Sequence, residues 1–279
     1  MLKKTKKMVR DFLPPVITRT IVQMRYGKKP KYLNFSGNYK SWEEALKHSA
    51  GYDTDVILEK VKNSALKVKR GFAFFERDSV AFGKPEYVWP VLAILLWVAS
   101  QKNNSLNVVD FGGSLGSIYF QHKKFLSGMN ELKWSVVEQE NFVRCGKENF
   151  EDDVLKFFDT MESCARNPRA DVCLLSSVLP YLKEPYEVLK EILSYEPSHI
   201  VLDRTAFWQE SDRDDRITVQ KVPAKIYDAS YPAWFFNEKK FLDFFSQKYE
   251  FVAEFKAPEG TIELDGATAI YKGFLFKRL

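Results

Sequence analysis

A carboxylate and three glycines stand together at residues 110–116, where the sequence is Asp-Phe-Gly-Gly-Ser-Leu-Gly. An apolar run precedes Asp110, and a stretch that can begin a helix follows at Ser117. A buried strand that ends in an acid and turns through glycines into a helix is typical of α/β domains that bind a nucleotide-like cofactor. The segment therefore predicts a cofactor site, with an ordinary glycine turn as the alternative.

The glycine spacing indicates the cofactor. A dinucleotide fingerprint has glycines at its first, third and sixth positions, but counting from Gly112 the third and sixth positions are serines. Asp110, Gly112 and Gly116 instead give the acidic-x-Gly-x-x-x-Gly pattern of S-adenosylmethionine (SAM) sites. Glycines here, including Gly113, let the backbone turn sharply against a ligand. The free N–H groups of the helix start could hold the methionine carboxylate of SAM.

Further carboxylates recur at the spacing of strand–helix units. Glu138 ends a second apolar run, 28 residues after Asp110, where it can accept hydrogen bonds from both ribose hydroxyls of an adenosine. Asp159 ends a third run, where an adenine amino group could be bound, and Asp203 ends a fifth at 199–203. Each acid alone could be a solvated residue or a helix cap. Their repetition favours a parallel sheet with a ligand at its carboxyl edge.

Composition narrows the class of protein. The chain of 279 residues is 45% hydrophobic, enough for one large core. Three cysteines without metal spacing and three scattered histidines predict no metal site and favour a reducing, cytoplasmic compartment. The longest apolar run, at 88–99, covers 12 residues, too few to span a bilayer, and is expected to be a buried helix.

Positive charge is concentrated at the N-terminus. Residues 1–31 carry ten Lys and Arg and one Asp, and because the whole chain has a net charge of +5, residues 32–279 carry −4. This basic segment with interspersed apolar residues could lie on the anionic inner face of a membrane, and a solvated arm is the alternative. Nucleic acid is not expected as a partner because no basic stripe continues through the chain.

The pattern of elements predicts three zones. Residues 1–35 form a basic N-terminal arm, 36–104 a mainly helical extension that begins at the capping box Ser41–Glu44, and 105–279 the cofactor-binding domain. About 33 residues separate Asp203 from the next expected helix near Asn237. Connections of that length commonly serve as lids or binding elements, so we expect a long lid after the fifth strand.

As a set, several motifs resemble a bacterial family of SAM-dependent methyltransferases from gene clusters for O-antigen, capsule and other surface polysaccharides. The motifs are DFGGSLGS at 110–117, VVEQ at 136–139, SSVLPYL at 176–182, DRTAF at 203–207, YPAW at 231–234, GYD at 51–53 and ERDS at 76–79. The resemblance covers roughly residues 36–279. It implies the class I methyltransferase fold, a Rossmann-like, seven-stranded, mostly parallel sheet whose last strand is antiparallel.

The resemblance also implies roles for the matching residues. The expected cofactor residues are Asp110, Gly112, Gly113 and Gly116 around SAM, Glu138 at its ribose and Asp159, in a weaker motif, near its adenine. Ser114 departs from the commonest class I pattern, which has a third glycine at that position, and this could alter the turn slightly.

Methyl transfer to a neutral hydroxyl also needs a base within hydrogen-bond reach. Asp203 is the leading candidate, with Arg204 orienting it or binding an anionic acceptor; the alternative is a pair that only pins the lid. Asp78 is a second candidate base, and Tyr181 and Tyr231 could line the acceptor pocket.

Together these features predict a SAM-dependent methyltransferase that O-methylates a sugar or sugar-linked group, free or lipid-linked, during surface-polysaccharide biosynthesis. The alternative is a non-catalytic SAM-binding scaffold of a membrane-associated glycan assembly complex. An NAD-dependent enzyme is excluded by the glycine spacing.

Overall fold

The computed structural model describes residues 34–50, 54–165, 169–210, 212–222 and 229–279. The predicted basic arm, residues 1–35, lies almost wholly outside this range, and the GYD motif at 51–53 lies wholly outside it. Residues 35–279 form one compact unit. The division into an arm, an extension and a cofactor domain stays a prediction.

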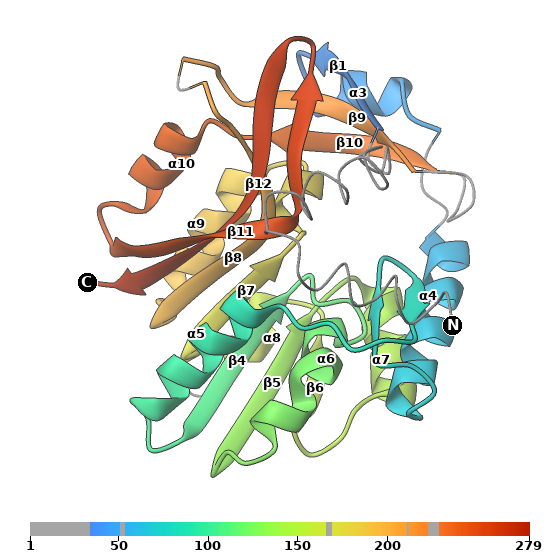
Figure 1. The fold of residues 1–279 in the computed structure, drawn as a ribbon, viewed down its shortest axis with the longest axis vertical. Coiled ribbons are helices and arrows are strands. Elements are labelled where there is room, and N and C mark those ends of the chain that lie inside the picture. The colour runs from blue at the N-terminus through green and yellow to red at the C-terminus, as the bar shows by residue number, and fades with distance from the viewer. Residues whose placement is uncertain (1–33, 51–53, 166–168, 211, 223–228) are drawn as a thin grey trace, which may run out of the picture. The chain divides into compact units, whose positions relative to one another are not determined.

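A seven-stranded sheet with the order β11-β12-β8-β7-β4-β5-β6 is the centre of the fold (Figure 1). Its strands, in sheet order, are β11 (Tyr249–Leu264), β12 (Ala267–Arg278), β8 (His199–Trp208), β7 (Val172–Ser176), β4 (Ser105–Phe111), β5 (Glu131–Val137) and β6 (Leu155–Phe158). Neighbouring strands from β8 to β6 are parallel, and β12 is antiparallel to both β8 and β11. This is the class I methyltransferase arrangement that the resemblance of the motifs implied.

Strand β4 occupies the point where the winding of the sheet reverses. It pairs with β5 on one side and with β7 on the other, and its successor strands then lead away in opposite directions. The strand is apolar and buried because helices cover both faces, as parallel sheets require. Ligands of open α/β sheets bind outside the carboxyl ends of the strands at such a reversal. The topology therefore predicts a ligand site directly after Asp110.

Two hydrophobic clusters pack against the sheet, one on each face. The first contains side chains from α4 (Thr54–Lys69), α5 (Trp89–Ser100), α6 (Ser117–Leu126) and α7 (Glu140–Asn149). The second contains side chains from α8 (Met161–Ala165), α9 (Pro185–Ser194) and α10 (Glu238–Phe245). Each helix thus buries its apolar stripe on one face and leaves the carboxyl edge of the sheet to the loops.

The segment predicted to be a lid contains regular structure. It forms β9 (Arg216–Lys221) and β10 (Ser230–Phe235), which join β1 (Asn34–Tyr39) in a three-stranded sheet of order β1-β9-β10. The helix expected near Asn237 is α10, and the Asn237 side chain caps it by accepting from Lys240 N at 2.7 Å. The fifth strand, β8, continues beyond the predicted end at Asp203 to Trp208.

The region at 36–104 combines helices with short strands. Ser41 caps α3 (Trp42–Lys47), since its Oγ accepts from Glu44 N at 3.1 Å, while the Glu44 side chain reaches back to Lys40 N. The helix expected at 88–99 is α5. Between α4 and α5 lies a hairpin that the sequence did not predict, β2 (Phe75–Arg77) and β3 (Val80–Phe82).

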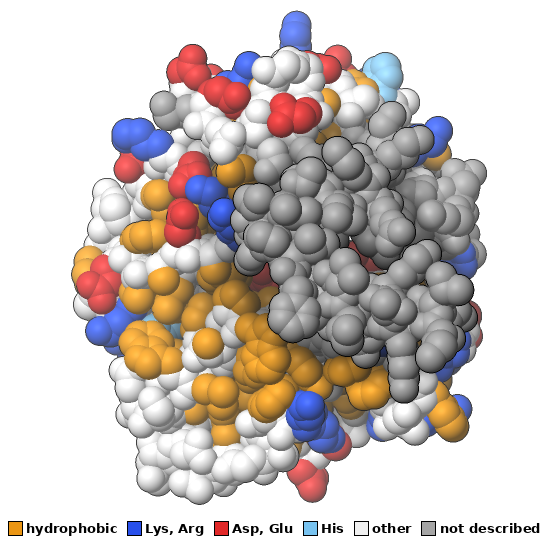
Figure 2. Space-filling view, viewed as in Figure 1, with side chains coloured by type: hydrophobic (Ala, Val, Ile, Leu, Met, Phe, Trp, Pro, Cys, Tyr) orange, Lys and Arg blue, Asp and Glu red, His pale blue; other side chains and the backbone are white. Residues whose placement is uncertain are grey.

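Helix α5 leaves large apolar side chains at the surface. Trp89, Leu96 and Trp97 are 58%, 39% and 41% exposed, and Figure 2 shows hydrophobic side chains gathered over this part of the molecule. Within the described residues, no helix is both long and apolar enough to cross a bilayer.

Candidate functional site

The glycine turn between β4 and α6 is held in a conformation that side chains would obstruct. Gly112 has φ of 71° and Gly116, the N-cap of α6, has φ of 85°. A Cβ on Gly112 would overlap the Val178 side chain, and one on Gly113 would lie 2.5 Å from the Asp110 carboxyl carbon. The turn therefore passes close to both β4 and the loop after β7, with its N–H groups at the edge of the sheet.

Ser114 takes the left-handed backbone conformation, with φ of 55°, at the position where the commonest class I pattern has glycine. A serine in this conformation is strained by roughly 1 kcal/mol. This departure from the commonest class I pattern thus keeps the turn and carries a modest energetic cost.

Asp110 is fully buried at the end of β4. Its Oδ2 accepts a hydrogen bond from Trp134 Nε1 at 3.0 Å, and its Oδ1 has no partner among the described residues. Burial, with a smaller effect from the negative charge of Glu138, raises the pKa of Asp110 to about 7, although the Trp134 hydrogen bond acts in the opposite direction. An unsatisfied buried oxygen of this kind is rare in folded proteins and often marks a ligand or functional site.

Glu138 follows β5 and binds the glycine turn. Its Oε1 accepts from Ser114 N at 3.2 Å and its Oε2 from Gln139 N at 2.8 Å, so both carboxylate oxygens are oriented by backbone donors. Burial is the largest cause that raises the pKa of Glu138, and the two backbone hydrogen bonds lower it. The structure thus brings Glu138 and the glycine turn together, and each oxygen keeps a lone pair for a further donor.

Asp159 lies directly after β6 and is exposed. The ends of the three strands are joined by backbone bonds, from Gly112 N to Val137 O at 2.9 Å and from Glu138 N to Phe158 O at 3.1 Å. Asp159 therefore belongs to the same edge of the sheet as the glycine turn, two strands away.

Asp203 is fully buried and lies opposite the end of β7. It pairs with Ser176, the last residue of that strand, and Ser176 Oγ donates to Asp203 Oδ2 at 2.9 Å. Asp203 Oδ1 is buried without a hydrogen-bond partner among the described residues. Burial raises the pKa of Asp203, while the Arg204 charge and the Ser176 hydrogen bond lower it. A carboxylate with a raised pKa is a better proton acceptor than an exposed one.

Arg204 projects from a β-bulge. Residues 203 and 204 of β8 stand opposite the single Gly273 of β12, and Arg204 has φ of 55°. A bulge re-aims the side chain of the extra residue. The Arg204 guanidinium donates from Nε to Glu259 Oε1 at 2.6 Å and from Nη2 to Asp78 Oδ2 at 3.1 Å. Arg204 therefore bridges two carboxylates from distant parts of the chain.

Tyrosine rings lie beside this group of charges. Tyr181, at the end of the 3₁₀ turn Leu179–Tyr181, meets Tyr231 edge to face with ring centroids 5.3 Å apart. Tyr271 of β12 is buried. Burial raises the pKa of both Tyr181 and Tyr271 above the usual value, with smaller effects from the Arg204 and Glu259 charges. Tyr181 and Tyr231, proposed from the sequence as pocket residues, are brought together.

Sequence reasoning missed two residues of the site, Glu76 and Glu259. Glu76 is buried in the β2–β3 hairpin; Ser117 Oγ, at the start of α6, donates to its Oε2, and Ser79 N donates to its Oε1 at 2.9 Å. The β2–β3 hairpin thus contacts the end of the glycine turn through Glu76 and contacts Arg204 through Asp78. The ERDS motif was the available signal for Glu76, but no local pattern marked Glu259.

The histidines occupy structural positions. His122, within α6, is buried, accepts from Val88 N through Nε2 at 3.1 Å, and has its pKa lowered to about 4 by burial. His199 begins β8, at the opposite edge of the sheet from Asp110. His48 stacks on Tyr39. No cluster of three or more His, Cys, Asp or Glu with metal-binding geometry occurs among the described residues.

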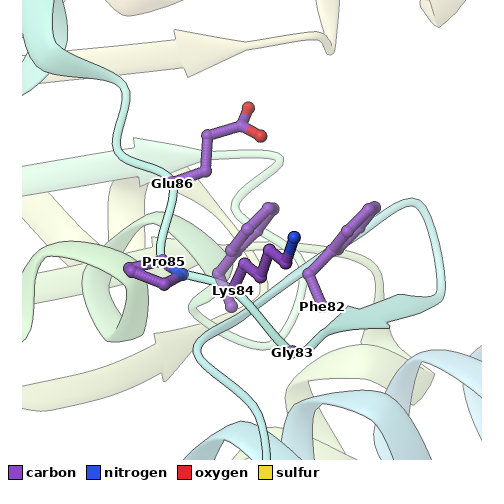
Figure 3. Close-up of a pocket in the computed structure, with 6 residues that line it drawn as sticks. Phe82, Gly83, Lys84, Pro85 and Glu86 are labelled. Carbon is purple, nitrogen blue, oxygen red and sulfur yellow. The ribbon is translucent and has the colours of Figure 1, made fainter. Parts of the chain in front are cut away.

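An open cavity of about 630 Å³ lies beside the β2–β3 hairpin (Figure 3). Its lining residues are Phe75 and the segment 82–86, in which the Phe75 and Phe82 rings stack at 4.5 Å. None of them is a residue predicted to bind the cofactor, so we place the candidate site at the carboxyl edge of β4, β5, β7 and β8 rather than in this cavity.

Comparison with known proteins gives similarity at the level of fold. No protein-family model matches the sequence, and no curated protein sequence matches it. Matching solved structures include the N-terminal domain of EvdMO1 with S-adenosylhomocysteine (SAH) bound, with 14% identity, a TM-score of 0.47, and 81% of this chain and 97% of that chain covered.

Two further matches have names that state a methyltransferase. Magnesium protoporphyrin IX methyltransferase from Synechocystis PCC 6803 with bound SAM is 12% identical, with a TM-score of 0.44 and 82% and 99% of the two chains covered. CalS10, an amino pentose methyltransferase from Micromonospora echinaspora, is 11% identical, with a TM-score of 0.43 and 78% and 97% covered. The order of the strands described above, rather than these distant similarities, carries the fold assignment.

Proposed function

We propose that the protein is a SAM-dependent methyltransferase. The observation that carries the proposal is the set of features at the switch point of the sheet. A buried Asp110 oxygen lacks a donor, the glycine turn leaves no room for a Cβ at two positions, and Glu138 presents oriented carboxylate oxygens. These features suit a ligand with an amino-acid end and a ribose, placed against the backbone.

The residues present fit SAM in a defined manner. The N–H groups of the turn at 112–116 would hold the methionine carboxylate, Glu138 would accept from the ribose hydroxyls, and Asp159 would lie near the adenine. When bound, the cofactor supplies an electrophilic methyl group. The protein's own contribution is to hold the acceptor in line with that group, which can lower a barrier by about 7–11 kcal/mol in well-oriented systems.

Asp203 is the residue best placed to accept a proton from an acceptor hydroxyl. It is buried, one of its oxygens lacks a donor, and its pKa is raised by burial. Ser176 holds the other oxygen and so fixes the orientation of the carboxylate. General base catalysis of this kind contributes about 10²–10⁴ in rate. Arg204, the next residue in the chain after Asp203, would position Glu259 and Asp78 through its hydrogen bonds to them.

The acceptor that we propose is a hydroxyl on a sugar or a sugar-linked group used in surface-polysaccharide assembly in the cytoplasm, at the inner face of the membrane. The resemblance of the DFGGSLGS, DRTAF and YPAW motifs supports this class, and the tyrosine pair offers apolar ring faces beside polar groups. The basic residues at 1–31 would supply the membrane contact. A scaffold that binds SAM without turnover remains the second outcome of the experiment below.

Calorimetric titration with SAM, SAH and NAD tests the cofactor site. We expect micromolar binding of SAM and SAH and none of NAD. Glu138→Gln should weaken SAH binding about 10-fold or more, because a charge-assisted hydrogen bond contributes about 1.5–3 kcal/mol. Glu140→Gln, two residues away on the exposed start of α7, is the matched control and should bind as the wild type does. Absence of binding by both SAM and SAH would refute the proposal.

Turnover separates the enzyme from the scaffold. With any acceptor that the wild type methylates, Asp203→Asn should leave SAH affinity within about twofold and reduce kcat by about 10²–10⁴. Unchanged kcat would show that Asp203 is structural. SAM binding without methylation of any glycan precursor would favour the scaffold.

A further inference from the structure

The charged groups around Arg204 are mainly carboxylates, and this limits the kind of acceptor that the site would bind. Glu259 and Asp78 accept from two different nitrogens of the guanidinium, and Asp203 is its neighbour in the chain. Three carboxylates therefore surround one cation. The arginine is already neutralised by its two partners, so it has little capacity to attract a carboxylate or phosphate of a substrate.

Two carboxylate oxygens of this group lack a hydrogen-bond donor. Asp203 Oδ1 belongs to a side chain with 0% exposure, and Glu259 Oε2 is buried on a side chain that is 12% exposed. Neither has a partner among the described residues. The two groups lie close enough for the Glu259 charge to contribute to the raised pKa of Asp203, after the larger effect of burial. Buried acceptors without donors are costly, and a ligand that supplies donors would remove that cost.

Irregularities in two strands create this arrangement. Arg204 projects from the bulge in β8, and Glu259 lies in a stretch of β11 between Lys256 and Thr261 that is out of register with β12. Gly260, beside Glu259, has φ of 70°. Bulges of this kind occur next to active sites, where they re-aim a side chain. In Figure 1 the β11–β12 hairpin extends well past the ends of β7 and β8, on the side of the sheet edge that carries the site.

We propose that Asp203 Oδ1 and Glu259 Oε2 together bind the acceptor by accepting hydrogen bonds from it, and that the acceptor is a donor-rich ring, uncharged or cationic, without an acidic group at this end. Tyr181 and Tyr231 would pack against the apolar face of the ring. An acidic ring would meet a site with more negative than positive charge and would offer acceptors where donors are needed. This inference rests on the proposed function, and it replaces the expectation that Arg204 binds an anionic acceptor.

Saturation-transfer NMR on the full-length, SAH-loaded protein at neutral pH tests the proposal. The probes are three matched rings, methyl glucoside, methyl glucosaminide and methyl glucuronide, which differ in one neutral, cationic or acidic group. We expect binding of the glucoside and the glucosaminide, and at least 10-fold weaker binding of the glucuronide. Equal or tighter binding of the glucuronide, or no binding by any of the three, would overturn the proposal.

Variants at Glu259 connect the selectivity to this residue. Glu259→Gln keeps a carbonyl for Arg204 Nε and removes the charge; it should weaken binding of the glucoside and the glucosaminide by roughly 10- to 100-fold. Glu254→Gln, on the exposed part of the same strand, is the control and should change nothing. Asp203→Asn should weaken binding similarly, which provides a second route if Glu259→Gln unfolds. Unchanged binding by both variants would refute the assignment.

The SAH titration keeps the two proposals separate. SAH binding with no effect of the Glu259 and Asp203 variants would refute this inference alone. Binding of the neutral and amino rings that depends on Glu259, by a protein that does not bind SAH or SAM, would retain this inference and refute the proposed function.

Discussion

A single methyl group at residue 113 should disturb the cofactor site by an amount that the structure allows us to work out. In Gly113→Ala the added Cβ would lie 2.5 Å from Asp110 Cγ, 2.6 Å from Oδ2 and 2.9 Å from Oδ1. These separations are shorter than the usual contact of about 3.5–4.0 Å by roughly 1 Å. Gly113 is not in the left-handed region, so the effect is steric and not conformational.

Asp110 has little freedom to move away from the added methyl. It is fully buried, and Trp134 Nε1 holds its Oδ2 at 3.0 Å. The turn must therefore shift outwards, toward the space that we assign to SAM. Overpacking of this kind costs about 1–3 kcal/mol, which corresponds to a roughly 5- to 150-fold weaker binding constant if it falls on the bound state.

Calorimetric titration with SAH and urea unfolding measure where that cost appears. We expect weaker SAH binding, with any remainder as a lower free energy of unfolding. Gly128→Ala is the matched control, since a Cβ at residue 128 meets nothing within 4 Å and the backbone there is not left-handed. It should leave SAH binding unchanged and stability equal or slightly higher. If Gly113→Ala matches this control in both measurements, the close packing of the turn on Asp110 is refuted.

Three further predictions concern stability and membrane contact. Burial raises the pKa of Asp110 from the usual 3.8 to about 7, so the native state retains a proton that the unfolded chain loses. The Asp110 contribution to the free energy of unfolding should therefore fall as the pH rises from about 4 to 7, by up to about 4 kcal/mol. Asp110→Asn should show a correspondingly weaker fall in urea unfolding, and parallel curves for the wild type and the variant would contradict the shift. Glu76→Ala should lower the free energy of unfolding by about 1–3 kcal/mol because it leaves Ser117 Oγ and Ser79 N without their acceptor. Glu76→Gln, which keeps an acceptor oxygen, should lower it by less than about 1 kcal/mol. Equal decreases in the free energy of unfolding for the two variants would argue against these hydrogen bonds. Residues 1–31 carry a net charge of +9, and their deletion should abolish binding to anionic liposomes in a sedimentation assay. Unchanged liposome binding would rule out these residues as the membrane contact.

The parallel strands of the sheet were predictable because they depend on patterns that repeat locally. Each apolar run that ends in an acid became a parallel strand, and the turn at 110–116 lies between β4 and α6 as expected. The Ser41 and Asn237 caps also follow from single residues beside their helices. Right-handed crossovers then leave few ways to arrange such units, and all of them bring the strand ends with Asp110 and Glu138 to one edge.

The sequence did not predict the small sheet of β1, β9 and β10. Strand β1 lies far from β9 in the chain, so its pairing depends on tertiary structure rather than on a local signal. The β2–β3 hairpin was missed for a different reason. Its turn has Asp78 and Ser79 at φ of 51° and 68°, and Ser79 stands at the position where glycine is the usual signal.

The chain by itself thus determined the α/β class, the parallel strands that end in acids and the glycine turn, since each follows from hydrophobic periodicity and from backbone conformations that only a few residue types favour. The acceptor side was decided by the tertiary structure alone. Arg204 meets Asp78 and Glu259, which lie 126 and 55 residues away, only because a bulge in β8 and an out-of-register stretch of β11 turn these side chains toward one another. Such irregularities arise from the pairing of whole strands, and no spacing within a single segment encodes them.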